Sequence, residues 1–338
     1  MTESRMYEPA MRRAMELSLL GPTYGGNPQV GAVILDKDLN IIAEGFHKGA
    51  GTSHAEVMAL AELSSVPEGA TAVVTLEPCN HTGKTGPCAK ALIEVGIMKV
   101  VYGAKDPGQE SSGGEKTLVA AGVEVVSGVL SAEIAEQQKI WLTAISNNRP
   151  FITLKWAQSL DGRSAASDKS SKWITGSDAR NHVHLMRSQL DAILVGTNTV
   201  AVDDPELTAR KPDGTLYEHQ PLRVVMGSRE LSSSLRVFNS DAKTVQYKTH
   251  SIQDVLSELW KLEIRHLLVE GGATVISEFI KQGQFDEILV YQAPLLIGGN
   301  NVAVEDLELN TLNDAIQLSF SEVKVLGKDV LFRAVRSN

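Results

Sequence analysis

The chain has 338 residues, of which 43% are hydrophobic and 22% charged, and a formal net charge of −9 at pH 7. This composition is typical of a soluble globular protein, and the length predicts two domains, because single cores seldom grow past about 250–300 residues. The acidic balance lacks the basic character of nucleic-acid-binding proteins, and no segment approaches the ~20 apolar residues that cross a bilayer. We therefore expect neither a nucleic-acid partner nor a membrane partner.

The sequence has only two cysteines, which excludes a disulfide framework and suits a reducing compartment. Residues 1–5 include no apolar stretch of the kind that a secretory signal peptide needs. From these two features we expect a cytoplasmic protein.

The first half of the chain alternates predicted helices and strands. Apolar residues at helical spacing predict the helices, and short apolar runs between turn residues predict the strands. The expected elements are a helix over 6–20, strands over 30–35 and 41–46 joined by a turn at 36–40, a helix from His54 to about Leu63, a strand over 72–76, a helix over 88–95, a strand over 99–102, a helix over 116–121, a strand over 123–126 and a helix over 131–145.

The polar segment 146–150 predicts a domain boundary, with domains over 1–147 and 148–338. The elements expected after it are a strand over 151–156, a helix over 178–187 capped by Ser177, strands over 192–195 and 223–226, a helix over 252–262, a strand over 267–269, a helix from 273 to about 281, and strands over 288–291, 323–325 and 330–332. This alternation predicts an α/β fold with a mostly parallel sheet and a late hairpin.

One histidine and both cysteines form a pattern that is typical of a catalytic zinc site. His54 and Glu56 are followed by Cys79 and Cys88, and a proline precedes each cysteine. Three protein ligands leave the fourth tetrahedral position of Zn²⁺ for a water, whose pKa falls toward about 7. Glu56 could then carry the proton of that water to a leaving amine, as in the hydrolytic deaminases with the signature H-x-E…P-C-x-x-C.

This chain departs from that signature, since eight residues separate its cysteines instead of two. His54 and Glu56 fall in the first turn of one predicted helix and Cys88 starts another, and helix N-termini favour thiolates. The alternative interpretation is a buried thiol pair with an unrelated surface histidine. The presence of both cysteines in one short segment favours zinc.

Two glycine-containing turns in the second half are candidates for phosphate binding. The segments 196–199 (GTNT) and 270–272 (EGG) each follow a predicted strand, and the second also opens a helix, which is a geometry suited to anions. No G-x-G-x-x-G follows a strand, so the Rossmann fingerprint is absent. Without further support, such turns are more often tight turns than phosphate sites.

The segment 75–88 (TLEPCNHTGKTGPC) resembles the T-L-E-P-C-S-H-x-G-[KR]-T-P-P-C stretch of the bifunctional deaminase–reductases of riboflavin biosynthesis. Further segments resemble the same family: 27–33 (NPQVGAV), 154–163 (LKWAQSLDGR), 173–175 (WIT), 203–208 (DDPELT), 269–272 (VEGG) and 293–299 (APLLIGG). The match covers essentially the whole chain, in order and in both halves.

The resemblance implies a two-step enzyme. An N-terminal cytidine-deaminase-like three-layer α/β/α domain would hydrolyse the 2-amino group of 2,5-diamino-6-ribosylamino-4(3H)-pyrimidinone 5′-phosphate. A C-terminal dihydrofolate-reductase-like α/β domain would then reduce the ribosyl group to ribityl with NADPH, giving 5-amino-6-ribitylamino-uracil 5′-phosphate. The resemblance also implies one Zn²⁺ per chain on His54, Cys79 and Cys88, with Glu56 as the proton shuttle.

Binding residues are also implied by the resemblance. The deaminase substrate would contact Asn27, His47, His81 and Lys84. NADPH would contact Ala157, Trp173, Thr199, Asp203, Ser228 and Gly272. The reductase substrate would contact Ser171, Arg187, Leu207, Arg210 and Glu270, and the two arginines suit its phosphate because a guanidinium makes bidentate contacts. We expect Lys155 and Glu270 to act catalytically at the ribosyl end, whereas the alternative for Lys155 is a strand-end lysine that extends to solvent.

The sequence departs from the family pattern at four places: Gly26 replaces a proline, Asn80 a serine, 106–109 (DPGQ) a D-P-N-P, and 226–228 (MGS) a D-S pair. None removes a metal ligand or Glu56. Two other functions stay open. One is a zinc deaminase of another nucleobase with a degenerate second domain, and the other is a nucleotide sensor whose structural zinc takes His81 as fourth ligand. We also expect a homo-oligomer, a dimer or a tetramer, that binds a small pyrimidine ribotide.

Overall fold

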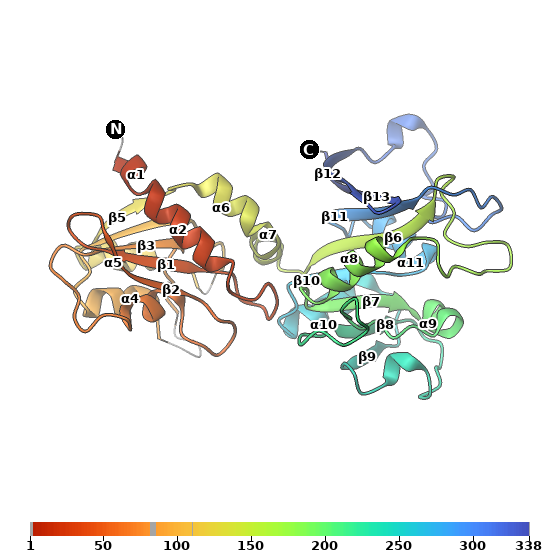
Figure 1. The fold of residues 1–338 in the computed structure, drawn as a ribbon, viewed down its shortest axis with the longest axis horizontal. Coiled ribbons are helices and arrows are strands. Elements are labelled where there is room, and N and C mark those ends of the chain that lie inside the picture. The colour runs from red at the N-terminus through yellow and green to blue at the C-terminus, as the bar shows by residue number, and fades with distance from the viewer. Residues whose placement is uncertain (1–2, 82–85, 110, 338) are drawn as a thin grey trace. The chain divides into compact units, whose positions relative to one another are not determined.

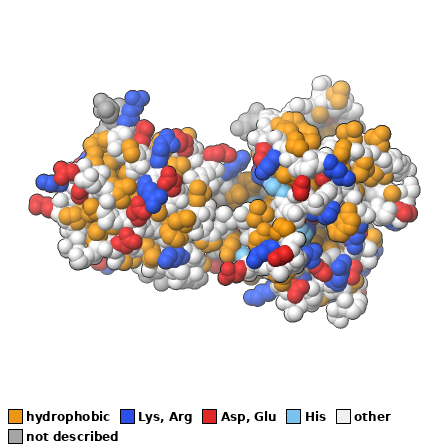
Figure 2. All heavy atoms as spheres, in the orientation of Figure 1, with side chains coloured by type: hydrophobic (Ala, Val, Ile, Leu, Met, Phe, Trp, Pro, Cys, Tyr) orange, Lys and Arg blue, Asp and Glu red, His pale blue; other side chains and the backbone are white. Residues whose placement is uncertain are grey.

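The computed structural model describes residues 3–81, 86–109 and 111–337, and it divides into two compact units, Met1–Asn148 and Arg149–Asn338 (Figure 1). Each unit contains a mixed sheet with helices on both faces, so the expected α/β class is confirmed. Among the described residues, no helix is long and apolar enough to cross a membrane. Figure 2 shows acidic and basic side chains interspersed over the face in view of each unit.

The sheet of the first unit has the strand order β2-β1-β3-β4-β5. Strands β1 and β2 form an antiparallel hairpin, β1 pairs antiparallel with β3, and the remaining pairs are parallel. The strands are β1 (Gly31–Leu35), β2 (Ile41–Phe46), β3 (Thr71–Leu76), β4 (Lys99–Ala104) and β5 (Glu124–Ser127).

Helices cover both faces of this sheet, which gives three layers. The helices are α1 (Glu3–Met6), α2 (Glu8–Ser18), α3 (Ala55–Leu60), α4 (Cys88–Glu94), α5 (Gly114–Ala120), α6 (Ser131–Gln137) and α7 (Lys139–Asn147). Apolar residues of α3, α4 and α5 pack on one face, and those of α2, α6 and α7 pack on the other. Because the strands β1 and β3 are covered on both faces, every residue of both strands is buried.

The helix predicted over 131–145 is in fact two helices, which meet at Gln138. Gln138 has φ −104° and ψ 16°, outside the helical region, and it is buried. The change of direction lets Ile134 enter the core below α6 while Nε1 of Trp141 in α7 donates to the carbonyl of Gly26 at 3.1 Å. Tertiary packing therefore overrides a continuous helical pattern. The helix after His54 is also shorter than predicted, and ends at Leu60.

The second unit has an eight-stranded sheet in the order β12-β13-β11-β6-β10-β7-β8-β9. The six strands from β11 to β9 pair in parallel, and β12 and β13 form an antiparallel hairpin that joins the sheet at β11. The strands are β6 (Phe151–Ser159), β7 (Ala192–Gly196), β8 (Leu222–Met226), β9 (Thr244–Tyr247), β10 (His266–Val269), β11 (Glu287–Ala293), β12 (Leu318–Leu326) and β13 (Asp329–Arg336).

Four helices cover this sheet: α8 (Ser177–Arg187), α9 (Thr197–Asp203), α10 (Ile252–Lys261) and α11 (Ala273–Lys281). Helices α10 and α11 pack on one face, and α8 and α9 on the other. Two 3₁₀ turns, η1 (Arg236–Phe238) and η2 (Leu312–Asp314), lie in loops. The predicted cap Ser177 is wrong: it is the first residue of α8, and Gly176 takes the cap position without a side-chain bond.

Candidate active sites of the two units

The structure brings His54, Cys79 and Cys88 together. His54 is the N-cap of α3, Cys79 follows the end of β3, and Cys88 is the first residue of α4. Nδ1 of His54 lies 3.4 Å from Sγ of Cys79 and 3.2 Å from Sγ of Cys88. Zinc bonds of about 2.0–2.3 Å place tetrahedral ligands roughly 3.5 Å apart, so the three residues fit one zinc ion. Among the described residues, no further His, Cys, Asp or Glu belongs to this group.

Charge and hydrogen bonding at the cluster favour a thiolate. The thiol of Cys88 contacts Cys79, and this contact lowers the pKa of Cys79 to about 4. The backbone N–H of Cys88, at the start of α4, also donates to Sγ of Cys79 at 3.4 Å. The contact with Cys79 in turn raises the pKa of His54. An anionic sulfur beside an imidazole is the donor set that zinc prefers.

Glu56 lies in the first turn of α3, two residues after His54, and its side chain is buried. Burial raises the pKa of Glu56, and the negative charge of Cys79 adds to the effect. A carboxyl group with a raised pKa exchanges protons closer to neutral pH than an exposed glutamate does. The position next to the potential metal ligands and the raised pKa both suit a group that moves protons.

Asn27 and His47 lie next to the cluster. Nδ2 of Asn27 is 2.9 Å from Nε2 of His47, and Nδ1 of His47 is 3.2 Å from the carbonyl oxygen of Ser53. These bonds are satisfied together if Asn27 donates to Nε2 and the Nδ1–H of His47 donates to Ser53. Burial lowers the pKa of His47, which keeps the ring neutral, and its centroid lies 5.3 Å from that of His54.

His81 follows Cys79 by two residues, and its Nδ1 is buried without a partner among the described residues. It does not belong to the group of potential metal ligands. Lys84 lies outside the described residues. A pocket of about 410 Å³ between α3 and α4 adjoins the cluster through the neighbours of His54 and Cys88, and its lining includes Ser53, Val57, Pro87 and Lys90.

Two of the departures in the first unit, Asn80 and the segment 106–109, lie in one connected region. The backbone N–H of Asn80 donates to the carbonyl of Ser111, and its Oδ1 accepts from Oγ1 of Thr117 at 2.9 Å. A serine at this position would have a shorter side chain. Asp106, in the altered 106–109 loop, is buried, and burial raises its pKa. Asn80 therefore joins the loop after the first cysteine to α5.

In the second unit, three charged residues meet at the carboxyl end of β10. Nζ of Lys155 lies 3.3 Å from Oε2 of Glu270, and Arg187 of α8 binds both Glu270 oxygens at 2.8 and 2.9 Å. Burial alone would raise the pKa of Glu270, but Arg187 and Lys155 lower it to about 2. Lys155 lies in the middle of β6 with 15% of its side chain exposed, so the alternative of a strand-end lysine in solvent is wrong.

Sequence reasoning missed Tyr291, which lies beside Lys155. Nζ of Lys155 is 5.6 Å from the centroid of the Tyr291 ring, and the Tyr291 hydroxyl is 2.8 Å from Nδ1 of His182. Tyr291 is buried on β11, opposite Ala157 of β6. A lone aromatic residue in an apolar strand gives no signal in sequence, because it is more often a core residue.

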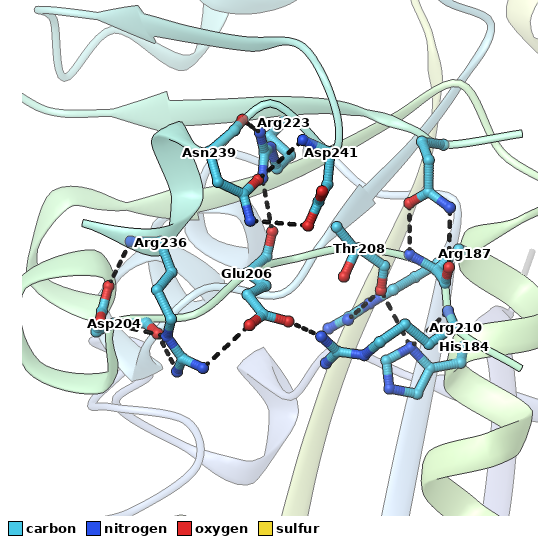
Figure 3. A network of polar contacts seen from close by, with 12 residues as sticks. His184, Arg187, Asp204, Glu206, Thr208, Arg210, Arg223, Arg236, Asn239 and Asp241 are labelled. Atoms are coloured by element: carbon cyan, nitrogen blue, oxygen red, sulfur yellow. Dashed lines mark hydrogen bonds and ion pairs between the residues drawn. The ribbon is translucent and has the colours of Figure 1, made fainter. Parts of the chain in front are cut away.

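Arg210, Leu207 and Arg187 lie around one loop. Nη1 of Arg187 donates to the carbonyl of Thr208 at 3.1 Å, and the N–H of Arg210 lies 3.3 Å from Nδ1 of His184 (Figure 3). Leu207, three residues before Arg210, is buried. Burial and the two arginines lower the pKa of His184 to about 4, so it is neutral at pH 7. Arg210 also pairs with Glu206.

Three turns lie side by side at the carboxyl ends of β10, β7 and β8. Oγ1 of Thr199 accepts a hydrogen bond from the N–H of Gly272 at 3.0 Å, which joins the first two turns. Gly227 in the third has φ 132°, and a Cβ there would lie 2.6 Å from Oγ1 of Thr197. Ser228, after it, contacts Nε2 of His250 at 3.2 Å. A crevice at the carboxyl ends of parallel strands is where such sheets bind nucleotides.

Of the other expected cofactor residues, Ala157 lies in β6, Trp173 in the loop before α8 and Asp203 at the end of α9. Nζ of Lys172 donates to the carbonyl of Asp203 at 3.0 Å, which holds residues 171–173 beside α9. Ser171 is half-buried, whereas Trp173 is 70% exposed and stacks on Arg180 at 4.6 Å. The exposed ring of Trp173 is available to stack on a flat ligand.

Comparison with known proteins assigns a family to each half. The family model described as "RibD C-terminal domain" matches residues 150–332, and the one described as "Cytidine and deoxycytidylate deaminase zinc-binding region" matches residues 4–104. A riboflavin biosynthesis protein RibD from Mycobacterium tuberculosis is 44% identical over 331 residues, which cover 97% of both chains. This chain belongs to the RibD family.

Other RibD proteins agree over the whole length. RibD from Corynebacterium ammoniagenes is 45% identical over 92% of this chain and 93% of its own. The solved structure of Acinetobacter baumannii RibD has a TM-score of 0.90 at 34% identity and covers 99% of this chain and 100% of its own. A Thermotoga maritima structure, a diaminohydroxyphosphoribosylaminopyrimidine deaminase/5-amino-6-(5-phosphoribosylamino)uracil reductase, has a TM-score of 0.87 at 34% identity, with 99% of both chains covered.

Proposed function

We propose that this RibD-family chain carries out two consecutive steps of riboflavin biosynthesis. The first unit removes the 2-amino group of 2,5-diamino-6-ribosylamino-4(3H)-pyrimidinone 5′-phosphate, and the second reduces its ribosyl group to ribityl with NADPH. The observation that carries the proposal is the pairing, in one chain, of a His54–Cys79–Cys88 cluster beside Glu56 with a RibD C-terminal domain. Relatives with both halves match over nearly the full length.

In the deamination, a zinc ion held by the cluster would lower the pKa of a water molecule to about 7 and so supply the nucleophile. Glu56 accepts the proton from that water as its oxygen adds to the carbon that bears the amine. The same carboxyl then gives the proton to the amine, which leaves as ammonia. The raised pKa of buried Glu56 suits both transfers. We propose that Asn27 and neutral His47 hold the pyrimidine, with His81 and Lys84 as further contacts.

In the reduction, bound NADPH would supply the hydride to C1′ of the ribosyl group. The Lys155 ammonium gives a proton to the sugar ring oxygen as the ring opens, so that the product gains one hydride and one proton. Glu270 pairs with Lys155 and so fixes its position, and Arg187 fixes Glu270 with two hydrogen bonds. We propose Arg187 and Arg210 for the substrate phosphate, with Ser171 and Leu207 beside them.

We propose that NADPH binds across the three adjacent turns at the ends of β10, β7 and β8. Gly272 is the N-cap of α11, a nine-residue helix whose free N–H groups favour a phosphate. Thr199, Ser228, Asp203 and Ala157 lie around the same edge of the sheet, and Trp173 is available to stack on a ring. A thiolate-based zinc site suits a reducing environment, and we propose a cytoplasmic location for this reason.

We also propose that the chain forms a homo-oligomer through β12, the edge strand of the second sheet. Phe320, Val323 and Val325 are 69%, 58% and 71% exposed, and an exposed apolar edge strand favours pairing with another chain. Antiparallel pairing of two β12 strands about Val323 would place Glu322 opposite Lys324 of the second copy. Val325→Lys should reduce the molecular mass measured by light scattering; an unchanged mass would rule out this edge.

One alternative is a deaminase with a degenerate second half. The Lys155–Glu270–Arg187 cluster argues against it, because two cations around a buried carboxylate are costly to maintain without use. The proposal is tested by following ammonia release and NADPH oxidation with the ribotide as substrate. Ammonia should be released without NADPH, and NADPH should be consumed only after ammonia. NADPH consumption by the Glu56→Gln variant at the wild-type rate would contradict this order.

A further inference from the structure

The loop between α9 and β8 carries Leu207 and Arg210 and has an unusual backbone. Asp204 and Leu207 have φ values of 40° and 54°, in the left-handed region that residues other than glycine rarely adopt. A branched, buried leucine in this conformation persists only where surrounding contacts hold it, and such positions cluster at functional sites. The contacts that hold this loop therefore determine where Arg210 lies.

One of these contacts is Arg223, a fully buried residue of β8. Its Nη1 donates to the carbonyl of Glu206 at 3.1 Å and to Oδ1 of Asn239 at 2.8 Å, and its Nη2 donates to the carbonyls of Asn239 and Ala242. Figure 3 shows its guanidinium between the Glu206 and Asn239 segments. Arg223 thus fixes the backbone immediately before Leu207 to the segment that follows η1.

The second contact is Arg236, at the start of η1. Its backbone N–H donates to Oδ1 of Asp204 at 2.7 Å, and its Nε donates to Oδ2 of Asp204 at 3.2 Å. Its Nη1 lies 3.2 Å from Oε1 of Glu206, and its Nη2 donates to the carbonyl of Asp204. Arg236 therefore binds the loop at Asp204, the first of its two left-handed residues, and at Glu206, which precedes Leu207.

Glu206 continues this chain of contacts to Arg210. While Oε1 of Glu206 binds Arg236, its Oε2 pairs with Nη1 of Arg210 (Figure 3). The side chain of Glu206 is 24% exposed and that of Arg210 is 32% exposed. The guanidinium of Arg210 is therefore accessible to a ligand, while its ion pair with Glu206 fixes its orientation. Arg187 and Arg210 then present two cations near neutral His184.

We propose that Arg236 is a positioning residue of the reductase unit, which acts through Asp204 and Glu206 to direct Arg210 at the substrate phosphate. This inference rests on the proposed function, which assigns the phosphate to Arg187 and Arg210. Arg236 does not itself meet the substrate. When the Arg236 side chain is absent, Glu206 is free to rotate with Arg210. The strained loop then keeps its contacts with Arg223 but loses those with the Arg236 side chain. The consequence falls on substrate binding rather than on hydride transfer.

The test compares two substrates of the reductase, the deaminated ribosylaminouracil 5′-phosphate and the same compound without phosphate. Arg236→Ala should raise the KM for the phosphorylated compound about tenfold and leave kcat within about twofold. For the compound without phosphate, kcat/KM should equal that of the wild type, because Arg210 has no phosphate to bind. Arg236→Lys keeps the positive charge but cannot contact Asp204 and Glu206 together, so it should restore part of the affinity for the phosphorylated compound.

Two controls make the result specific. Lys261→Ala removes an exposed ion pair with Glu258 on α10, on the other face of the sheet, and should change neither KM. Glu206→Gln should weaken phosphate binding as Arg236→Ala does, and the double variant should lose no more than the worse single variant, since both act through one chain of contacts. Ammonia release by the first unit, and the melting temperature, report whether each variant is folded.

The possible failures are distinguishable. Equal losses on both substrates, a raised KM for NADPH, or additive losses in the double variant would each overturn the role of Arg236 and leave the proposed function intact. A wild-type enzyme that reduces both compounds with equal kcat/KM would overturn the assignment of phosphate to Arg210 and this inference with it. A wild-type enzyme that reduces neither compound would overturn the reductase function itself, and the inference as well.

Discussion

Two glutamates at the two sites have opposite electrostatic environments. Burial raises the pKa of Glu56, whereas Arg187 and Lys155 outweigh burial and lower the pKa of Glu270 to about 2. Carboxylates whose environments move their pKa values apart take different roles. Glu56 is suited to exchange protons, and Glu270 is suited to remain an anion that pairs with Lys155.

Glu56→Gln tests the first of these roles. Glutamine keeps the shape of the side chain but cannot accept a proton, so the rate of ammonia release should fall by about 10²–10⁴-fold. Zinc content and reduction of the deaminated substrate should stay at wild-type levels, because neither depends on this carboxyl group. The matched control is the Cys79→Ser/Cys88→Ser variant, which should lose both ammonia release and zinc. Wild-type ammonia release by Glu56→Gln would show that another group is the base.

His266 predicts a pH dependence of stability in the second unit. It is buried, its Nε2 lies 3.0 Å from Oγ1 of Thr153, and burial lowers its pKa to about 4, against an opposing effect of Asp191. The unfolded chain takes up this proton at about pH 6.5, so the free energy of unfolding should fall as the pH drops from about 6.5 to 4. The slope from this residue reaches at most about 1.4 kcal/mol per pH unit.

Chemical denaturation of His266→Gln, followed by tryptophan fluorescence, measures this contribution. The variant should show a shallower loss of stability than the wild type between pH 6.5 and pH 4. Identical slopes for His266→Gln and the wild type would mean that His266 takes up its proton in the folded protein as readily as in the unfolded chain.

At the scale of elements, local patterns predict what depends on local chemistry. The β1–β2 hairpin, the helix starts at His54 and Cys88, and every parallel strand of the second sheet except β9 follow from apolar runs and turn residues. The break between α6 and α7 and the short helix α9 do not, since packing against the sheets decides them. The same limit applies to the sites. The zinc motif lies within residues 54–88 and can be recognised from the sequence, whereas Tyr291, Glu206 and Arg236 become neighbours of their sites only in the folded chain.

The turn after β8 is the element at which this chain departs from the D-S pair of its family. Ser228 contacts His250, and Nη1 of Arg229 lies 3.3 Å from Oδ1 of Asn198 at the start of α9. A hydroxyl and a guanidinium at the end of a strand suit the 2′-phosphate that distinguishes NADPH from NADH. We therefore expect Ser228→Ala/Arg229→Ala to raise the KM for NADPH about tenfold, or about 1.4 kcal/mol, and to change that for NADH little.

Steady-state kinetics with both cofactors check this expectation, with exposed Lys261→Ala as the control. Equal losses for NADPH and NADH would mean that the turn does not bind the 2′-phosphate. The segment 226–228 (MGS) would then belong to a cofactor pocket that differs from those of other family members.

At the scale of the whole molecule, the boundary between the units predicts an independent second unit. The segment at the boundary is fixed within that unit, because Arg149 makes two hydrogen bonds to Asp286, whose Oδ2 also accepts from the N–H of Ile152. A fragment over 149–338 keeps both helix layers and the whole sheet, and we expect it to fold and bind NADPH.

Circular dichroism and cofactor fluorescence measure both properties of the fragment. Arg149→Ala in the same fragment should lower its melting temperature without loss of NADPH affinity, since Asp286 lies at the opposite end of the strands from the three turns. A fragment that is unfolded alone would show that the second unit depends on the first.

The central claim is that one chain performs deamination first and reduction second. Mass spectrometry of the product formed from the diaminopyrimidinone ribotide, with and without NADPH, tests it most directly. Without NADPH, the deaminated but unreduced ribosyl compound should accumulate, and with NADPH the ribityl compound should replace it. A ribityl product that still carries the 2-amino group, or an unchanged substrate under both conditions, would contradict the account.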